Sequence, residues 1–479
     1  MREIARLLLP SIRWNPTLGM AAVRPTVERA LDAGVGGFVL DAVPPEASLE
    51  LTAAIRDRAD EAPLLVMDPG ALGDRTIRRQ TLALPPPAAI ASLRDAHVVR
   101  RVARLTARAV RRTGCNAMLG PSCNVAGAPA VESFGADASS VALAVAESVD
   151  AVQAEGVLCC VGSFPGTGRA TDDVSALPVV RVTEDSLYAI DLVPFRAAID
   201  AGAAAVSMAA AAYPSLDARM EPAALSPAVI DRVLRQQLGF DGLVAADAAL
   251  LERRVGRPVA ACDLVAAGVD LVLHTDRLDA DLRGLLDAVT DGRVDRERVH
   301  DAARRRRERA ELAGAPAPPD ARREDEAWLD ELAERTIAVV RGRAVRIGAL
   351  VDVVVASDRR VDRAPLVQSF ADGVAQAGGD PAGVRHVHTV GPSPRSALVI
   401  VAAMTTRAVP SGPASAGHVP RELAAVCADA RQSRRDIAVV WCGHPDTTPA
   451  SLDADLLVAC WTASDAMLRA AGRWMMRRV

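Results

Sequence analysis

The stretch Ser226–Asp247, which reads SPAVIDRVLRQQLGFDGLVAAD, holds one complete helix–strand unit and decides the fold. Ser226 is a candidate helix N-cap, Pro227 suits the first helical position, and Gly239 ends the helix. Apolar residues at helical spacing predict one buried face: Ile230, Val233, Leu234 and Leu238. The apolar run Gly242–Asp247 follows after a connection as short as those of αβ units, and it predicts a buried strand.

The same alternation of apolar runs and amphipathic segments extends from the N-terminus to about residue 312. Eight runs predict strands: Leu7–Ile12, Val35–Leu40, Pro63–Asp68, Asn116–Gly120, Val157–Gly162, Ala203–Met208, Gly242–Asp247 and Val269–His274. Because a helical stretch follows each run, eight βα units favour a closed barrel over an open sheet. Unbroken apolar runs suit parallel strands that are buried on both faces. We therefore expect an α/β chain whose residues 1–312 form an N-terminal (β/α)8 TIM-like barrel.

Beyond the barrel the pattern predicts a second, smaller α/β layered domain over residues 336–479, with a linker and a connecting helix at 313–335. Its predicted strands are Thr336–Val340, Val351–Val355, Ala397–Ala402, Ile437–Trp441 and Leu456–Cys460. The last helix of the barrel region, Asp295–Leu312, contains the four-arginine run Arg304–Arg307 among five acidic residues. This mixture of charges predicts a solvated helix face rather than a contact with nucleic acid.

Composition excludes several classes of function. A net charge of −4 and an aromatic content of 3% argue against binding to nucleic acid or to an anionic membrane surface. All 56 basic residues are arginine, so no mechanism that needs a catalytic lysine is available. The eight cysteines form no CxxC motif and no cysteine–histidine pair at zinc-ligand spacing, so we expect no metal and no cofactor. Without a recognisable signal peptide or membrane span, we expect a cytoplasmic protein of undetermined oligomeric state.

Several short motifs occur in a characteristic order. They are Ser133-Phe134-Gly135 with Asp137, Phe164–Gly168 (FPGTG), Asp191–Arg196 (DLVPFR), Tyr213-Pro214, Leu225–Ile230 (LSPAVI) and Leu238–Gly242 (LGFDG). Together they resemble the barrel of family 3 glycoside hydrolases of the β-N-acetylhexosaminidase type, over about residues 5–312. The second domain is similar to the C-terminal domain of the two-domain members. The resemblance implies a retaining hydrolase of small carbohydrates or glycosides, in which a carboxylate attacks the anomeric carbon and water then breaks the glycosyl-enzyme.

The resemblance implies that Asp247 is the nucleophile, because the family places this aspartate at the tip of the seventh strand, just after the Gly-Phe-Asp-Gly turn. The barrel argument agrees, since catalytic residues of such barrels lie at the carboxyl ends of the strands. The alternative is that Asp247 only caps the next helix. The resemblance also implies substrate binding by Asp68 and Arg78. The segment between them lacks the usual Gln-Glu-Gly-Gly sequence, however.

Other family positions have changed, so we predict a degenerate site. The family's proton donor is a histidine after strand five, and its position here is Val174, in Thr171-Asp172-Asp173-Val174. The Lys-His pair before Phe-Pro-Gly is replaced by Gly162-Ser163, the arginine before Ser-Phe-Gly by Glu132, and the histidine after strand six by Ala210. Loss of a general acid typically lowers the rate by ~10²–10⁴-fold.

Two hypotheses remain open. The first is a hydrolase of reduced or altered specificity, with Asp247 as nucleophile, an acid from Asp172, Asp173 or Glu132, and Glu132 otherwise binding substrate. An aspartate could serve as acid if burial or a neighbouring carboxylate raised its pKa. The second is an inactive relative that acts as a sugar-binding or regulatory protein. A carboxylic acid about 5–5.5 Å from Asp247 would favour the first hypothesis.

Overall fold

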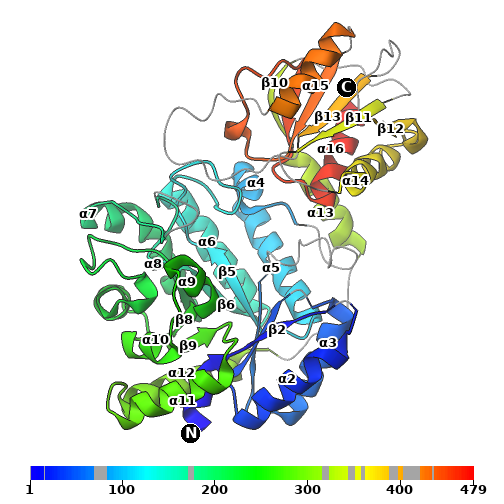
Figure 1. The fold of residues 1–479 in the computed structure, drawn as a ribbon. Helices are drawn as coiled ribbons and strands as arrows, with labels where there is room; N and C mark the ends of the chain where they lie inside the picture. Colours follow the sequence, from blue (N-terminus) through cyan, green and yellow to red (C-terminus); the bar gives the residue numbers. More distant parts are fainter. Residues whose placement is uncertain are drawn as a thin grey trace. The chain divides into compact units, whose positions relative to one another are not determined.

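The computed structural model describes residues 2–15, 17–41, 43–68, 84–170, 177–314, 323–342, 351–357, 362–387, 397–402, 421–433 and 436–478. The chain divides into two compact units (Figure 1). The first unit consists of Met1–Leu82, Asp95–Gly127 and Gly135–Asp320, and the second of Ala83–Arg94, Ala128–Phe134 and Ala321–Val479. Two short segments from the first third of the chain therefore belong with the C-terminal unit, which local sequence patterns did not indicate.

The first unit is built on a parallel sheet whose first strand is divided by Pro10. The strands are β1 (Leu8–Leu9), β2 (Ser11–Arg13), β3 (Gly37–Asp41), β4 (Leu64–Met67), β5 (Ala117–Ser122), β6 (Leu158–Phe164), β7 (Ala205–Met208), β8 (Leu243–Asp247) and β9 (Leu271–Leu273). Strand β1 pairs with β9, whereas β2 pairs with β3. Because β1 and β2 follow one another along the chain, these two pairings join the ends of the sheet. The predicted (β/α)8 barrel is confirmed.

The helices of this unit form an outer layer around the strands (Figure 1). They are α1 (Arg2–Ala5), α2 (Met20–Ala33), α3 (Pro45–Arg58), α5 (Ala96–Arg112), α6 (Ala138–Ala154), α7 (Glu184–Ser186), η2 (Leu187–Asp191), α8 (Val193–Asp200), η3 (Ala223–Leu225), η4 (Ala228–Gln237), α9 (Ala248–Val255), α10 (Ala261–Ala267), α11 (Leu278–Thr290) and α12 (Arg296–Leu312). Aspartates cap several of these helices. Asp95, for example, accepts hydrogen bonds from the backbone N–H groups of His97 and Val98 at the start of α5.

The helix predicted after Ser226 is η4, and it is wound more widely than an α-helix. Ser226 Oγ accepts a hydrogen bond from the Val229 N–H at 3.3 Å, which confirms the predicted cap. The Leu238 N–H bonds to the Val233 carbonyl five residues earlier, at 3.0 Å. This wider turn rotates the end of the helix, so Leu238 is half-buried although the α-helical spacing predicted that it lies on the buried face.

Small and branched side chains fill the inside of the barrel. Contributions come from nearly every strand: Leu9, Val39, Leu64, Val66, Ala117, Leu158, Cys160, Ala205, Leu243, Ala245, Leu271 and Leu273. Burial of each larger aliphatic side chain contributes roughly 1.5–3 kcal/mol to the free energy of unfolding. The interior is therefore a packed core, and chemistry is confined to the ends of the strands.

Helix α12 corrects the prediction that the arginine run lies on a solvated face. The Arg306 side chain is 1% exposed, and its Nη1 lies 2.9 Å from Glu61 Oε2. Its Nε also donates to the Gly36 carbonyl at 3.2 Å. Arg305 Nη1 lies 3.2 Å from Asp270, whose side chain is fully buried. Because Gly36 directly precedes β3, this face of α12 covers the amino end of the barrel, and half of the run is structural.

The second unit is a mixed sheet covered by helices. Its order is β10-β15-β14-β13-β11-β12, and only β10 runs antiparallel, against β15. The strands are β10 (Ala338–Gly342), β11 (Val351–Ala356), β12 (Val384–His386), β13 (Ala397–Ala402), β14 (Ile437–Trp441) and β15 (Leu456–Ala459). The helices are α4 (Pro87–Ser92), α13 (Arg323–Arg335), α14 (Ala364–Gln376), η5 (Pro381–Gly383), α15 (Arg421–Gln432), η6 (Pro445–Thr447) and α16 (Asp465–Arg478). The predicted α/β layered domain is confirmed, and β12 is an additional edge strand.

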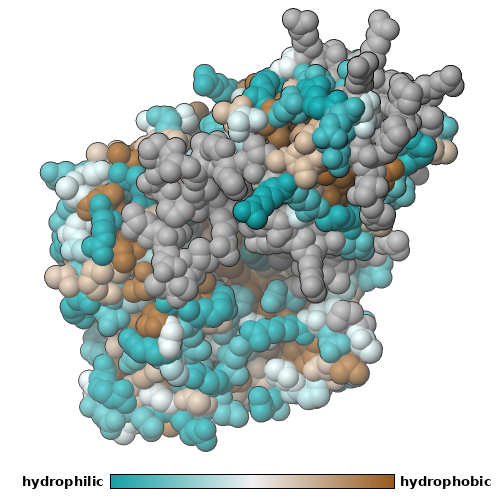
Figure 2. Space-filling model, turned by 45° about the horizontal axis from the view of Figure 1, so that its top comes forward, coloured by the Kyte–Doolittle hydropathy of each residue, from teal (hydrophilic) through white to brown (hydrophobic). Residues whose placement is uncertain are grey.

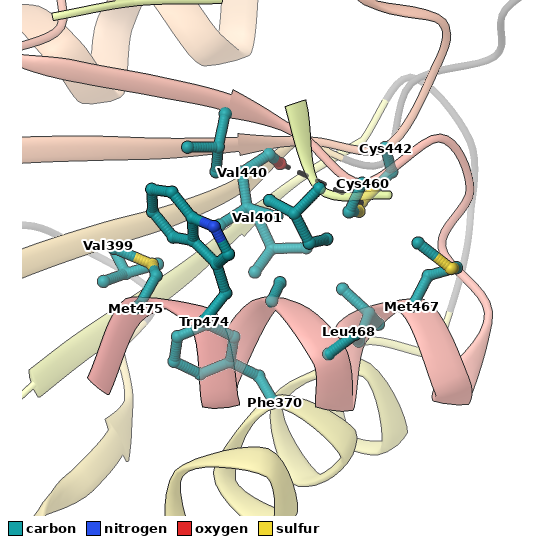
Figure 3. Close-up of a cluster of buried hydrophobic side chains, with 14 of the residues drawn as sticks. Phe370, Val399, Val401, Val440, Cys442, Cys460, Met467, Leu468, Trp474 and Met475 are labelled. Atoms are coloured by element: carbon teal, nitrogen blue, oxygen red, sulfur yellow. Dashed lines mark hydrogen bonds between the residues drawn. The ribbon is translucent and has the colours of Figure 1, made fainter. Parts of the chain in front are cut away.

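One face of this sheet packs against α14 and α16. Figure 3 shows Phe370, Leu468 and Trp474 between the helices and the strand residues Val399, Val401 and Val440. Leu398 and Ile400, which alternate with these valines along β13, belong to the core on the opposite face. The strands are therefore apolar on both faces, as expected for a parallel sheet between two helical layers.

The outer surface is mixed in character. The face drawn in Figure 2 shows hydrophilic side chains with hydrophobic ones scattered among them. Within the described part of the chain, no helix has both the length and the apolar character that crossing a membrane requires.

Candidate active site

Asp247 lies where β8 ends and α9 begins, at the carboxyl end of the barrel. Its Oδ1 accepts a hydrogen bond from the Leu250 N–H at 2.8 Å, so the residue does cap α9. Its Oδ2 lies 3.7 Å from Nε2 of His274, and the Asp247 side chain is 27% exposed. One carboxylate oxygen thus holds the helix, while the other faces the neighbouring strand end. The capping role is observed, and it leaves one oxygen for chemistry.

His274 directly follows β9, and sequence reasoning did not assign it to the site. Its Nδ1 lies 2.7 Å from the Ser11 hydroxyl, which comes from β2. Its side chain is 18% exposed, and its backbone N–H donates to the Leu9 carbonyl at 3.0 Å. The available signal was its place as the last residue of the predicted run Val269–His274, at the barrel end that holds catalytic residues.

More charged residues lie at the same end of the barrel. Arg13 Nη2 forms an ion pair with Asp276 Oδ2 at 2.7 Å. Leu40 of β3 pairs with Met67 of β4, so the residues that follow them, Asp41 and Asp68, come at the same edge of the sheet. Asp68 is exposed at this edge. The predicted strand-end position of Asp68 is therefore confirmed, and its role in substrate binding stays a prediction.

The Phe164–Gly168 motif packs against other segments that carried the family resemblance. The Phe164 and Phe195 rings meet edge to face, with their centroids 5.0 Å apart. The Tyr213 hydroxyl donates to the Gly166 carbonyl at 2.9 Å. Burial holds the pKa of the Tyr213 hydroxyl well above its usual value, so it stays a neutral donor. Through these contacts the motifs that contain Phe164, Phe195 and Tyr213 shape the loop after β6.

Arg169 fastens the same loop to the buried Asp191. Its Nε lies 3.1 Å from Asp191 Oδ1, its Nη2 contacts Oδ2, and its Nη1 donates to Ser186 Oγ at 3.0 Å. Burial raises the pKa of Asp191, and the neighbouring guanidinium opposes that rise. The described part of the loop ends at residue 170 and resumes at 177.

Several predicted site residues lie elsewhere or outside the described residues. Arg78 and Asp172 fall outside them, as does Asp173. Glu132 is exposed and belongs to the second unit. Three residues stand where the resemblance implies basic side chains, and all three lie in the first unit. Gly162 and Ser163 are half-buried, and Ala210 is buried.

Neither a metal centre nor a reactive thiol is found among the described residues. No group of three or more His, Cys, Asp or Glu side chains within them is arranged to hold an ion. All eight cysteines are free and buried. Burial raises the pKa of the Cys115 thiol to about 11 and that of Cys160 to about 12, so these thiols stay protonated and unreactive.

Comparison with known proteins agrees with this geometry. A beta-hexosaminidase of Thiobacillus denitrificans is 41% identical over 125 residues, which is 25% of this chain and 33% of that protein. A beta-N-acetylglucosaminidase/beta-glucosidase of Cellulomonas fimi is 31% identical over 182 residues, 34% of this chain and 32% of that protein. The chain thus spans about a third of the length of these curated relatives.

The fold has a similar counterpart among solved structures. A glycoside hydrolase family 3 beta-N-acetylglucosaminidase from Paenibacillus sp. str. FPU-7 superposes with a TM-score of 0.81 at 22% identity, covering 100% of this chain and 96% of that one. The model of the glycosyl hydrolase family 3 N-terminal domain matches residues 3–307, the whole barrel. The chain therefore belongs to glycosyl hydrolase family 3.

Proposed function

We propose that the protein hydrolyses O-glycosyl bonds of the β-N-acetylhexosaminide or β-glucoside type with retention of configuration. The observation that carries this proposal is the carboxylate of Asp247, which stands at the carboxyl end of β8 with Oδ1 held by the Leu250 N–H. This fixed carboxylate leaves Oδ2 for attack on an anomeric carbon. Family membership and the names of the two relatives support the class of reaction.

In the proposed reaction Asp247 Oδ2 attacks the anomeric carbon and the bond to the leaving oxygen breaks, which gives a glycosyl-enzyme. A protonated acid assists departure, and the resulting base then takes a proton from the water that releases the sugar. We assign the acid to Asp172, and substrate binding to Asp68 and Arg78. Because no basic side chain occupies positions 162, 163 and 210, we expect weaker sugar binding than in relatives that carry them.

The test compares turnover of a panel of 4-nitrophenyl glycosides by wild type and Asp247→Asn. The panel begins with the β-N-acetylglucosaminide and the β-glucoside. Asparagine still caps a helix but cannot form the glycosyl-enzyme, so release of nitrophenol should be lost while the melting temperature is kept. The control is Asp95→Asn, which changes the equivalent cap of α5 and should leave turnover unchanged.

A second candidate function is sugar binding without catalysis. The sequence change that favours it is Val174, which stands where the resemblance implies the proton-donating histidine, because loss of that acid impairs catalysis without removing a sugar-binding contact. Absence of turnover on every glycoside, together with a calorimetric signal for N-acetylglucosamine or glucose that is lost in Asp68→Asn, would establish this second function instead.

A further inference from the structure

We propose that His274 is a positioning residue for Asp247, and that Ser11 holds its ring with the Nε2 proton toward Asp247. This inference deepens the proposed function, since it rests on Asp247 as the nucleophile. It names two residues, from the first and last strands of the barrel, that prepare the carboxylate for attack.

Barrel closure brings the three side chains together. Leu273 of β9 pairs with Leu9 of β1 on one side and with Asp247 of β8 on the other. His274 follows Leu273 and therefore lies between the two neighbouring strand ends. Ser11 begins β2, two residues after Leu9. The ring of His274 bridges them, with Nδ1 2.7 Å from Ser11 Oγ and Nε2 3.7 Å from Asp247 Oδ2.

The Asp247 carboxylate favours one tautomer of the ring, because its oxygens only accept and therefore favour a proton on Nε2. The Ser11 hydroxyl, which can donate or accept, then donates to Nδ1. When the Ser11 hydroxyl donates to Nδ1, the ring proton of neutral His274 is on Nε2, which faces Asp247. The distance of 3.7 Å is longer than a hydrogen bond. Catalytic contacts of this kind are often long in unliganded sites and shorten when substrate binds. With Leu250 on Oδ1 and His274 beside Oδ2, each oxygen of the carboxylate then faces a donor.

The backbone conformation of His274 also indicates a functional position. Its φ is +57°, in the left-handed region that few residues other than glycine adopt. Such conformations cost free energy, and they gather at functional sites where the surrounding structure imposes them. The hydrogen bond from the His274 N–H to the Leu9 carbonyl holds this conformation at the strand end. The strained backbone aims the ring between Ser11 and Asp247.

The same distance argues that His274 is not the proton donor to the leaving group. The two groups of a retaining pair stand about 5–5.5 Å apart, because the sugar and its leaving oxygen lie between them. His274 Nε2 is nearer than that to Asp247. It is therefore placed to act on the nucleophile itself.

Among the described residues, His274 is the basic side chain placed to position the Asp247 carboxylate. Within the described residues it is the one basic side chain whose nitrogen lies within 4.0 Å of the Asp247 carboxylate. The nearby arginines have their own partners: Arg13 pairs with Asp276, and Arg277 with Glu252. Asp281 lines the same small pocket as His274, and burial raises its pKa.

The kinetic test uses two pairs of variants on the glycoside that wild type hydrolyses best. His274→Leu removes the donor, whereas the amide of His274→Gln places an N–H close to the position of Nε2. Ser11→Ala removes the hydroxyl that contacts Nδ1 of His274, and Ser11→Thr keeps it. We expect His274→Leu to lower kcat roughly 10–100-fold, the equivalent of one charge-assisted hydrogen bond, with KM changed little. His274→Gln should retain most of the wild-type kcat. Ser11→Ala should lower kcat less than His274→Leu does, and Ser11→Thr should retain more activity than Ser11→Ala.

A comparison of leaving groups separates positioning of the nucleophile from proton donation. The loss of kcat in His274→Leu should be equal for 4-nitrophenyl and 2,4-dinitrophenyl leaving groups. A much larger loss with the poorer leaving group would make His274 the acid and overturn the proposal. Equal activity of His274→Leu and wild type, or equal loss in His274→Leu and a folded His274→Gln, would also overturn it.

A second measurement does not depend on turnover. Nitrogen-15 spectra of the histidine rings, assigned with His274→Gln, should show the Nε2–H tautomer for His274 and a mixture in Ser11→Ala. Asp247→Asn should shift the His274 ring signals while those of the exposed His97 and His300 stay in place. Unchanged His274 signals would overturn the inference. If these shifts appear in a protein without turnover, the contact is established and only the proposed function fails.

Discussion

Arg169 and Asp191, which are separated by 21 intervening residues, form an ion pair whose carboxylate is completely buried, with Nε 3.1 Å from Oδ1. The pair fastens the loop after β6 to η2, and in the sequence Arg169 precedes the predicted acid, Asp172, by three residues. Burial alone would disfavour the ionised carboxylate of Asp191, so the Arg169 guanidinium is needed to stabilise it.

We expect Arg169→Met to lower the free energy of unfolding by roughly 3–5 kcal/mol at pH 7, since it leaves a buried carboxylate without a partner. Denaturant titration would measure the loss. The double variant Arg169→Met/Asp191→Asn should be more stable than the single one. A double variant no more stable than Arg169→Met would mean that the pair is not electrostatically coupled.

Two substitutions of Asp247 should separate its role as a helix cap from its proposed role in catalysis. Asp247→Ala removes the cap of α9 and should cost about 1 kcal/mol in the free energy of unfolding, whereas Asp247→Asn should cost much less. Both variants should lack glycosidase activity. Thermal melting and nitrophenol release, measured on the same samples, would check this. Activity retained in Asp247→Asn would rule out Asp247 as nucleophile.

Gly168 should not tolerate a side chain. A Cβ at this position would lie 2.0 Å from the Val125 carbonyl oxygen, so Gly168→Ala must displace backbone at the mouth of the barrel. The matched control is Gly284→Ala in α11, where a Cβ meets nothing within 4 Å. The control should raise the free energy of unfolding by about 0.5–1 kcal/mol, because alanine favours a helix interior. Melting temperatures should therefore move in opposite directions for the two variants.

Neighbouring arginines of α12 should differ sharply in how much each contributes to the free energy of unfolding. Arg306 is buried with Glu61, so Arg306→Met should cost roughly 3–5 kcal/mol in unfolding free energy. Arg304 is exposed and pairs with Glu308 within the same helix, so Arg304→Met should change the stability far less than Arg306→Met does. Chemical denaturation of both variants would test the contrast. Equal effects would show that α12 does not close the amino end of the barrel as described.

Asp217 should make stability depend on pH. Hydrogen bonds from Arg219 and Ser226 hold the pKa of Asp217 well below its usual value. A folded pKa below the unfolded one stabilises the protein above the unfolded value of about 3.9, and this contribution is lost as the pH falls toward the folded value. Asp217→Asn should therefore be less stable than wild type at pH 7, with the difference shrinking below about pH 4. A difference independent of pH would contradict this assignment.

The sequence alone determined the two α/β units and most of their strands. Apolar runs bounded by polar turns report burial on both faces of a strand, and this signal is local, so both α/β units and the strand-end position of Asp247 could be predicted. The short edge strand β12 was missed because Val384–His386 has only three residues and a mixed pattern. The burial of Arg306 was missed because composition along a helix does not show which neighbours compensate its charges.

The tertiary structure decided which strand ends meet. Ser11 and His274 are separated by 262 intervening residues, and no local pattern relates them; they come together because β1 and β2 close the sheet between β9 and β3. The same closure turns His274 toward Asp247. Periodicity reports how deeply each residue is buried, whereas contacts between distant residues depend on the register of the closed barrel. For that reason the strand-end position of Asp247 could be predicted from the sequence, and its contact with His274 could not.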